Sequence, residues 1–211
     1  MKTLLHPTYF PNIVTTALMV QKDVIWEVED NYQKQTYRNR CVICTDTGRH
    51  FLSIPIKHVG GDQGRQKYKE VKLDNDYPWQ RQHWRTLQTA YRTSPFFEYY
   101  EDDIAILYKQ PYDLLMDFNF ETLRVISECL QIELPKTRTT LYRKEVPKAM
   151  LDARFLVRCK NEQEFVQEEY VQVFGDRHGF INNTSILDLL FNEGTNALSY
   201  LNNFNLNFLN A

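Results

Sequence analysis

The chain lacks several features that mark common classes of protein. Its 211 residues carry a formal net charge of −2, whereas a general nucleic-acid binder needs a strongly basic face. No apolar run is long enough to cross a membrane, and the apolar stretch before His6 and Pro7 is too short for a secretory signal. We therefore expect a protein with no nucleic-acid partner and no membrane insertion.

Cysteine is scarce, with four residues in the chain. Cys41 and Cys44 form a C-x-x-C pair, but Cys129 and Cys159 stand apart, so the second pair of ligands that a zinc site needs is missing. On a strand, positions three apart face opposite sides of the sheet, which separates the two thiols. The sequence predicts no metal, no cofactor and reduced thiols in the cytoplasm.

Familiar catalytic motifs are also absent. The chain contains no G-x-S-x-G, H-E-x-x-H or G-x-G-x-x-G segment. The Gly-rich stretch VGGDQGRQKYK lacks the G-K-[ST] ending of a phosphate-binding loop and is typical of a surface loop. The motifs therefore do not specify a reaction.

Hydrophobic periodicity predicts an α+β, or irregular α/β, fold with a strand-rich N-terminal half that holds a mixed sheet and a helix-rich C-terminal half. A single domain spans 1–211, with a subdomain break near 74–78 as the alternative. The tail from 202 is Asn-rich and is expected to fray. Alternation predicts strands at 2–6, 23–30, 67–74 and 139–144 and a hairpin within 39–56, and helical spacing predicts helices at 12–21, 79–92, 96–109, 113–132 and 185–194.

The segment HPTYFPN follows the first predicted strand and leads into the first predicted helix. Ligands gather at such turns in open α/β sheets, because free N–H groups at a helix start favour anions. The flanking prolines stiffen the turn, so that His6 and Tyr9 are held in fixed directions for acid–base chemistry and ligand binding. The alternative is a buried turn whose histidine only satisfies a carbonyl group.

Positive charge is concentrated between residues 33 and 72, where nine lysines and arginines oppose three acidic residues. Arg38 and Arg40 share one face of an extended segment, and guanidinium groups bind phosphate or carboxylate through paired hydrogen bonds. Asn39 and Lys57 lie in the same stretch. This concentration of positive charge predicts a surface that binds an anionic small molecule such as a sugar phosphate or nucleotide sugar. The alternative is a solvated strand edge.

The predicted helix at 79–92 places Trp79, His83 and Leu87 on one stripe, next to a stripe that ends at Tyr91. His83 is a second candidate for acid–base chemistry, and Trp79 and Tyr91 are candidate ligand contacts. The alternative places all three in the core.

Three blocks of the sequence resemble the WbqC-like protein family. They are HPTYFPN at 6–12, the run that begins NYQKQTYRNRC at 31 and ends in WQRQHWRTLQTAYRTSPFFEYYEDD at 103, and SILDLLFNEG at 185–194. Together they cover roughly the whole chain in the same order. Members are associated with surface-polysaccharide (O-antigen) gene clusters, so the resemblance implies a transferase of polysaccharide biosynthesis, for example one that transfers glycine or another aminoacyl group to a sugar.

The resemblance also points to individual positions. One departure is that the family often begins His-Gln-Pro, whereas Pro7 follows His6 directly here. The positions carried over are His6, Pro7, Tyr9, Phe10, Pro11, Asn39, Arg40, Trp79, His83, Tyr91, Asp188, Asn192 and Glu193.

Three functional hypotheses follow. In the first, Arg38 and Arg40 bind the phosphate of an activated sugar, and His83 or His6 deprotonates the attacking group of a transferase reaction. In the second, the protein binds an anionic sugar nucleotide or a partner enzyme without chemistry. In the third, aromatic residues at 95–103 form the contact of a homodimer.

Overall fold

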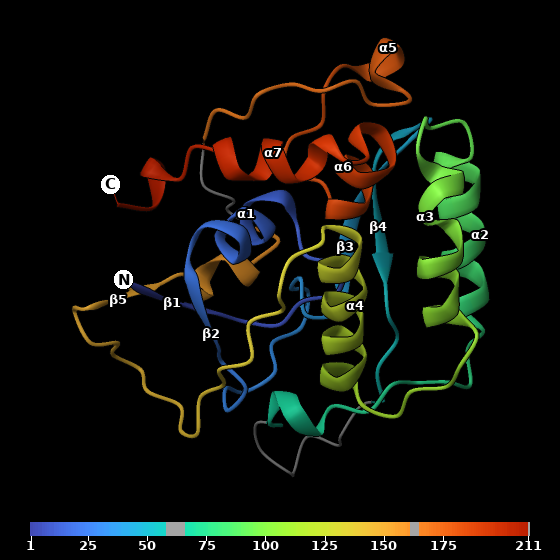
Figure 1. The fold of residues 1–211 in the computed structure, drawn as a ribbon. Coiled ribbons are helices and arrows are strands. Elements are labelled where there is room, and N and C mark those ends of the chain that lie inside the picture. The colour runs from blue at the N-terminus through green and yellow to red at the C-terminus, as the bar shows by residue number, and fades with distance from the viewer. Residues whose placement is uncertain (58–65, 161–164, 211) are drawn as a thin grey trace.

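The computed structural model describes residues 1–57, 66–160 and 165–210, and its mixed helices and strands confirm the α+β prediction (Figure 1). The strands form a three-stranded parallel sheet of order β2-β1-β5 and a separate two-stranded antiparallel hairpin. Arg65 and residues 59–64 of the Gly-rich stretch lie outside the described part. The strands are β1 (Lys2–Leu5), β2 (Asp23–Trp26), β3 (Arg40–Thr45), β4 (Gly48–Ser53) and β5 (Met150–Asp152).

The parallel sheet is built around β1. Thr3 lies beside Val24 of β2 on one side and beside Leu151 of β5 on the other. The last three residues of β1 are buried, as expected for a central strand of a parallel sheet, which is covered on both faces. Because all three strands run in the same direction, their carboxyl ends lie at one edge of the sheet.

The hairpin of β3 and β4 confirms the prediction within 39–56. The strands are joined at Asp46 and Thr47, and Gly48 has φ +97°, a conformation that side chains with a Cβ rarely adopt. In β3 the four central residues are buried, and α6 packs against this strand. The hairpin therefore lies against the helices rather than extending the parallel sheet.

The helices predicted from periodicity are all present. Asn12 accepts a hydrogen bond from the backbone N–H of Thr15 and caps α1, and Ser185 caps α6 through the N–H of Leu187. Short 3₁₀ segments η3 (Ile106–Tyr108), η4 (Arg154–Val157) and η5 (Asn207–Asn210) follow other elements. The α-helices are α1 (Ile13–Gln21), α2 (Trp79–Tyr91), α3 (Phe97–Ala105), α4 (Leu115–Cys129), α5 (Gly175–His178), α6 (Ile186–Glu193) and α7 (Asn196–Asn203).

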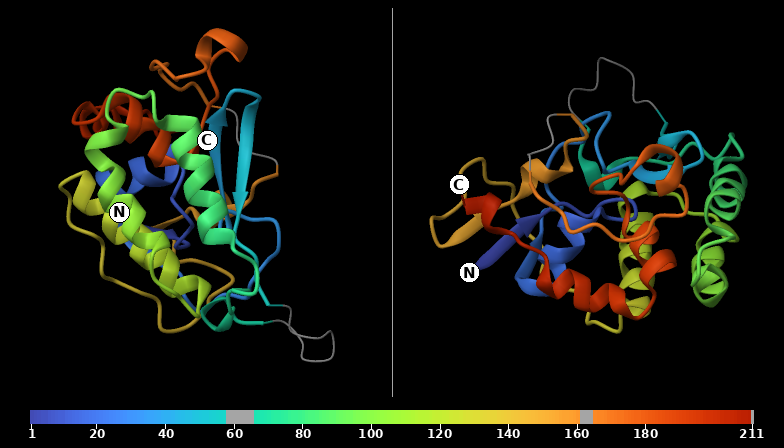
Figure 2. Two further views of the ribbon diagram at one scale, coloured as in Figure 1. Left: turned by 90° about the vertical axis from the view of Figure 1, so that its right-hand side faces the viewer. Right: turned by 90° about the horizontal axis from the view of Figure 1, so that it is seen from above.

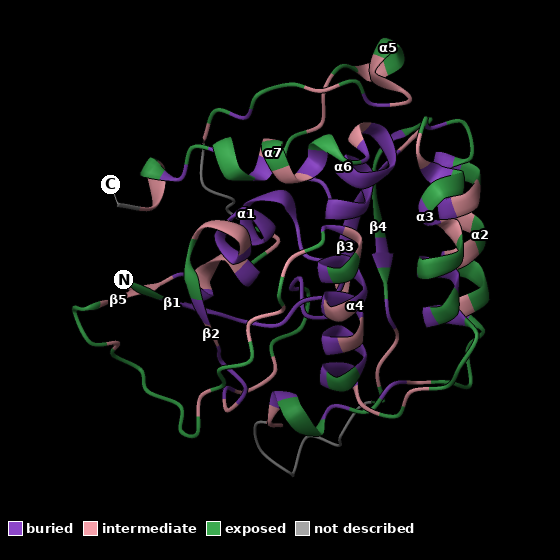
Figure 3. Ribbon diagram, in the orientation of Figure 1, coloured by how far each residue is buried: buried purple, intermediate pink, exposed green. Residues whose placement is uncertain are grey.

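One hydrophobic cluster includes buried side chains from Leu5 near the start of the chain to Leu206 near its end. The last helix, α7, lies beside α1, and Nε2 of Gln21 donates to the carbonyl oxygens of Leu201 and Phe204 (Figures 1 and 2). Phe204 and Leu206 are buried, so the prediction that the tail frays is wrong over these residues. By contrast, no residue from 131 to 150 is buried (Figure 3).

Two predicted strands are corrected by the structure. Residues 67–74 contain the 3₁₀ turn η2 (Tyr68–Glu70) because Tyr68 is anchored in the core, where its hydroxyl donates to the carbonyl of Pro7. Residues 139–144 form no strand, although the N–H of Thr139 donates to the carbonyl of Trp26. The third strand of the sheet is β5, which periodicity missed because it has only three residues. In the described part of the chain, no helix has the length and apolar character needed to span a bilayer.

Candidate functional site

Ionisable side chains from all three parallel strands gather at the carboxyl edge of the sheet. His6 directly follows β1, Asp30 lies shortly after β2, and Asp152 is the last residue of β5. In open sheets this edge is the usual place for ligands, above all where connections leave the central strand in both directions. Here β1 is the central strand, with β2 as its neighbour on one side and β5 on the other. His6, at the carboxyl end of β1, therefore lies in the middle of this edge.

The centre of the site is a contact of three buried groups. Nη2 of Arg38 donates to Oδ2 of Asp30 and to Nε2 of His6, at 2.9 Å in each case. Oδ2 of Asp30 also lies 3.3 Å from Nε2 of His6. Because Nε2 accepts a hydrogen bond from a permanent cation, we infer a neutral imidazole with its proton on Nδ1.

The electrostatics support a neutral His6. Burial, followed by the positive charge of Arg38, lowers the pKa of His6 from 6.5 to about 4. Burial raises the pKa of Asp30, but His6 when its ring is protonated, the charge of Arg38 and the backbone N–H of Asn31 outweigh it and hold that pKa below its ordinary value. At neutral pH the site therefore holds an uncharged base between a carboxylate and a guanidinium group.

A second ion pair lies beside this centre. Arg154 donates to both carboxylate oxygens of Asp152, from Nε at 2.8 Å and from Nη2 at 2.7 Å. Its Nη1 and Nη2 also donate to the carbonyls of Arg143 and Lys144, and Nη1 lies 3.6 Å from the carboxylate of buried Glu27. Arg154 therefore fixes the exposed segment before β5 against the edge of the sheet.

These groups line a cleft of about 190 Å³. The volume suits a phosphate, a carboxylate or a small zwitterion, and the lining carries charges of both signs. Its side chains come from the segments after β1 and β2, the segments before β3 and β5, and β5 with η4 and the residue after it. The lining residues are His6, Asp30, Gln33, Arg38, Tyr142, Asp152, Arg154, Phe155, Val157 and Arg158.

Arg38 is the most unusual residue of this cleft. It is 0% exposed, and its Nε and Nη1 make no hydrogen bond to the described residues. One face of the guanidinium lies over the ring of Tyr68, 5.3 Å from the centroid. Burying a cation with only one of its nitrogens paired is costly, and Nε and Nη1 keep their hydrogen-bonding capacity for a further partner.

The structure separates His83 from His6. Nδ1 of His83 lies 2.9 Å from the hydroxyl of Tyr9, and its Nε2 lies 3.2 Å from the carbonyl of Ser53. Burial lowers the pKa of His83 to about 4. His83 and Tyr9 line none of the described pockets and sit in an aromatic cluster with Trp79 and Tyr108. We assign them to the core, which is the alternative that the sequence left open.

Tyr91 also has a structural environment. Its hydroxyl accepts from the N–H of Cys44 and donates to Oδ1 of buried Asp188. The other carboxylate oxygen of Asp188 accepts from Tyr170, Gln172 and Thr184. Burial raises the pKa of Asp188, although these hydrogen bonds act in the opposite direction. Asp188 joins α6, α2 and the segment around 170 through its hydrogen bonds.

The predicted cationic surface is dispersed rather than continuous. Arg40 is half-buried, with its guanidinium over the ring of Phe51, and Asn39 donates to the carbonyl of Ile54. Lys57 is 4.0 Å from Asp76 in an exposed pair. Of the predicted ligand-binding residues, Arg38 alone joins His6 in the lining of the cleft.

The two thiols of the C-x-x-C pair occupy different environments on β3. Cys41 belongs to the hydrophobic core, whereas Sγ of Cys44 lies 3.6 Å from Nε2 of His178. Burial raises the pKa of Cys44 to about 12, so the thiol is protonated at neutral pH. In the described ranges, His, Cys, Asp and Glu form no group of three or more suited to a metal ion.

Sequence reasoning missed Asp30, Asp152 and Arg154. Asp30 could have been found, because it closes the segment DVIWEVED that the alternation identified as a strand, next to the same sheet edge. Asp152 and Arg154 carried no local signal, since the short strand β5 that positions them was not recognised.

Comparison with known proteins identifies the family of this chain. The model of the WbqC-like protein family matches residues 6–165, which include every residue that lines the cleft. The chain belongs to the WbqC-like protein family. It is also similar to the uncharacterized protein Rv1507c of Mycobacterium tuberculosis, with 28% identity over 200 residues that cover 81% of this chain and 83% of that protein. No solved structure matches the chain significantly.

Proposed function

We propose that this WbqC-like protein binds the anionic group of a small substrate in the carboxyl-edge cleft and transfers an acyl or glycosyl group in the cytoplasmic assembly of a surface polysaccharide. The observation that carries the proposal is Arg38, a fully buried cation with Nε and Nη1 unpaired by the described residues. The resemblance of the three sequence blocks to a family linked to O-antigen gene clusters supports the polysaccharide context.

In this proposal, Arg38 binds a phosphate or carboxylate oxygen and releases Nε2 of His6. The neutral imidazole then accepts the proton from an attacking hydroxyl or amine while that group forms a bond to the donor carbon and the donor's leaving group departs. Asp30, with Oδ2 3.3 Å from Nε2, stabilises the imidazolium that results. The leaving group takes the proton from His6 and restores the neutral ring.

One observation favours a second function, binding without chemistry. Nε2 of His6 already accepts a hydrogen bond from Arg38 and lies beside Asp30, so no lone pair of this nitrogen faces the cleft. A protein that only holds an anionic sugar nucleotide or presents it to a partner enzyme needs the arginine and no base.

Two variants distinguish these functions. Arg38→Lys keeps a positive charge but loses the guanidinium geometry, so we expect affinity for phosphate or a nucleotide sugar to fall about tenfold. His6→Gln keeps a polar side chain without a base, so we expect binding to persist while product formation stops. Calorimetry measures the binding, and mass spectrometry of reactions with nucleotide sugars and aminoacyl donors detects product.

Arg85→Lys, on the exposed face of α2, is the matched control and should leave binding unchanged. Product from wild type that persists in His6→Gln removes His6 from the chemistry. Saturable binding with no product from wild type supports the binding function. Absence of any binding of anions, or equal effects of Arg38→Lys and Arg85→Lys, contradicts both.

A further inference from the structure

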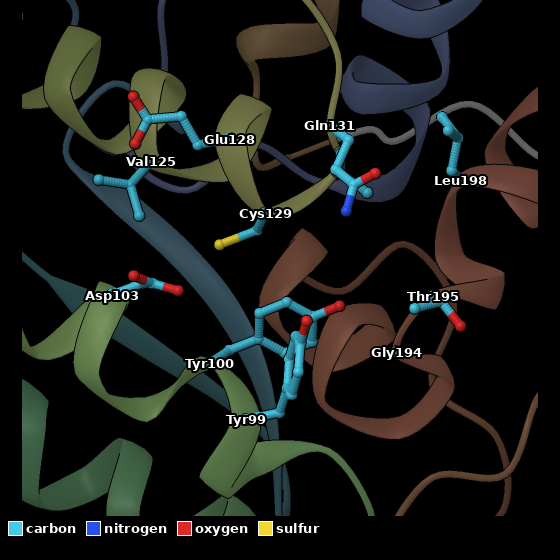
Figure 4. Close-up of a pocket in the computed structure, with 11 residues that line it drawn as sticks. Tyr99, Tyr100, Asp103, Val125, Glu128, Cys129, Gln131, Gly194, Thr195 and Leu198 are labelled. Carbon is cyan, nitrogen blue, oxygen red and sulfur yellow. The ribbon is translucent and has the colours of Figure 1, made fainter.

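A second pocket, of about 230 Å³, lies between α3, the end of α4 and the junction of α6 with α7 (Figure 4). It shares no lining residue with the carboxyl-edge cleft. Its lining includes two carboxylates, Asp103 and Glu128, and two aromatic side chains, Tyr99 and Tyr100, and contains no lysine, arginine or histidine. The charged side chains of this pocket are therefore all acidic, whereas the cleft around Arg38 carries charges of both signs.

Tyr100 gives this pocket a polar group that the fold leaves unused. The residue as a whole is 3% exposed, but its hydroxyl opens onto the pocket and makes no hydrogen bond to the described residues. Figure 4 shows the hydroxyls of Tyr99 and Tyr100 directed into the space between Cys129 and Thr195. The ring centroids lie 4.8 Å apart with their planes at 83°, and Tyr99 is 70% exposed, so Tyr99 offers its π face to a ligand and Tyr100 its hydroxyl oxygen.

The local field favours a positive charge. Glu128 is paired with Arg124 at 2.6 Å, but Asp103 has no ion pair with the described residues. Helix α4 ends at Cys129, and the negative end of its dipole faces the pocket. The carboxyl end of α6 and the amino end of α7 meet at Gly194 and Thr195, so these two dipoles offset each other.

The pKa of the Cys129 thiol reflects the same negative charges. Burial, followed by the charges of Asp103 and Glu128, raises the pKa of this thiol to about 12. The thiol is therefore protonated and unsuited to nucleophilic chemistry. The described residues offer no group of three metal-ligating side chains here, so the arrangement suits an organic cation better than a metal ion.

We propose that this pocket binds the protonated amine of a small hydroxylated molecule, with Asp103 and Glu128 pairing with the ammonium group and the exposed ring of Tyr99 contacting it through its π face. The ammonium group donates a hydrogen bond to the free hydroxyl oxygen of Tyr100. The side chains of Gln131 and Thr195, which are exposed at the rim, bind hydroxyl groups of the ligand. The proposal is independent of the function assigned to the cleft.

The test compares trans-4-aminocyclohexanol, a charged probe of suitable size, with its neutral counterpart trans-cyclohexane-1,4-diol. We expect saturable binding of the amine by ligand-observed NMR and calorimetry, weakened by salt, and at least tenfold weaker binding of the diol. Asp103→Asn should weaken amine binding about tenfold. Asp102→Asn, which neutralises the adjacent exposed carboxylate on α3, should leave it unchanged.

Tyr100→Phe provides a variant whose folding is safe, because the hydroxyl that it removes has no hydrogen-bond partner in the described part of the chain. We expect it to keep wild-type stability and to weaken amine binding several-fold. Equal binding of the amine and the diol, equal effects of Asp103→Asn and Asp102→Asn, or no binding of the amine by wild type would overturn the proposal. Phosphate binding at the cleft, measured separately, is unaffected by either result.

Discussion

At the scale of single residues, the two buried histidines have similarly lowered pKa values but different hydrogen-bond partners. Burial is the largest cause of the lowered pKa in both His6 and His83. His83 has the hydroxyl of Tyr9 and a backbone carbonyl as partners inside the core, whereas His6 lies between Arg38 and Asp30 at the wall of a cleft. The partners, rather than the pKa, identify His6 as the candidate base.

Both histidines should make stability depend on pH. Each has a pKa of about 4 in the folded protein and near 6.5 when unfolded, so the unfolded chain binds more protons between these values. Stability is therefore complete above pH 6.5 and falls as the pH drops toward 4, by roughly 3 kcal/mol for each histidine. Urea unfolding at a series of pH values measures this slope.

His6→Gln and His83→Gln should each reduce that slope, because each removes one of the two groups. Asn202→Ala, at an exposed position of α7, replaces no ionisable group, so it is the control and should not change the slope. Stability that is constant between pH 6.5 and 4, or equal slopes in all three variants, contradicts this account.

At the scale of elements, close contacts fix how short helices meet. Gly194 ends α6 with φ +54°, and a Cβ at this position would lie 2.5 Å from Cδ1 of Phe96, just before α3. The N–H of Phe96 also donates to the carbonyl of Phe191 in α6. The glycine is therefore required both by the backbone conformation and by the packing of α3 against α6.

Gly194→Ala should lower the free energy of unfolding by about 2–4 kcal/mol, since it combines an unfavourable φ with an overpacked contact. Chemical denaturation followed by circular dichroism measures the change. Gly175→Ala is the matched control, because a Cβ there meets only Cβ of Gln172 at 3.9 Å and the backbone has no positive φ. A loss of stability in the control as large as in Gly194→Ala would refute the packing argument.

Element prediction from the sequence succeeded where a local pattern was strong. The helical spacing in α2 and α4, the cap at Ser185 and the turn at Gly48 are all properties of neighbouring residues. It failed at Tyr68, where a long-range anchor to Pro7 converts an alternating segment into a 3₁₀ turn. Local patterns cannot report such an anchor, since the partner is distant in the sequence.

At the scale of the whole molecule, distant segments of the chain depend on one another. The parallel sheet joins residues 2–5 with 23–26 and 150–152, and α7 packs on α1 through the two hydrogen bonds of Gln21. Beyond α7, Phe204 and Leu206 are buried in the main hydrophobic cluster. The end of the described chain is therefore part of the structure that supports the sheet.

A truncation after Asn203 should lower the free energy of unfolding by about 3–6 kcal/mol, because it removes the two buried side chains of Phe204 and Leu206. The midpoint of urea unfolding measures the loss. Asn202→Ala, at an exposed position of α7, is the control and should stay within about 0.5 kcal/mol of wild type. An unchanged midpoint in the truncated protein would show that the tail is dispensable.

The sequence by itself determined the family, the main helices, the hairpin and the turn at 6–12, because each depends on a continuous run of residues. Only the tertiary structure decided which charged residues share a site. It brought Asp152 and Arg154 next to His6, although these two residues and His6 lie near opposite ends of the segment that the family model matches. It also buried Arg38 beside them and placed His83, Trp79 and Tyr91 in the core. Proximity between distant residues follows from strand order and helix packing, and no local pattern encodes either.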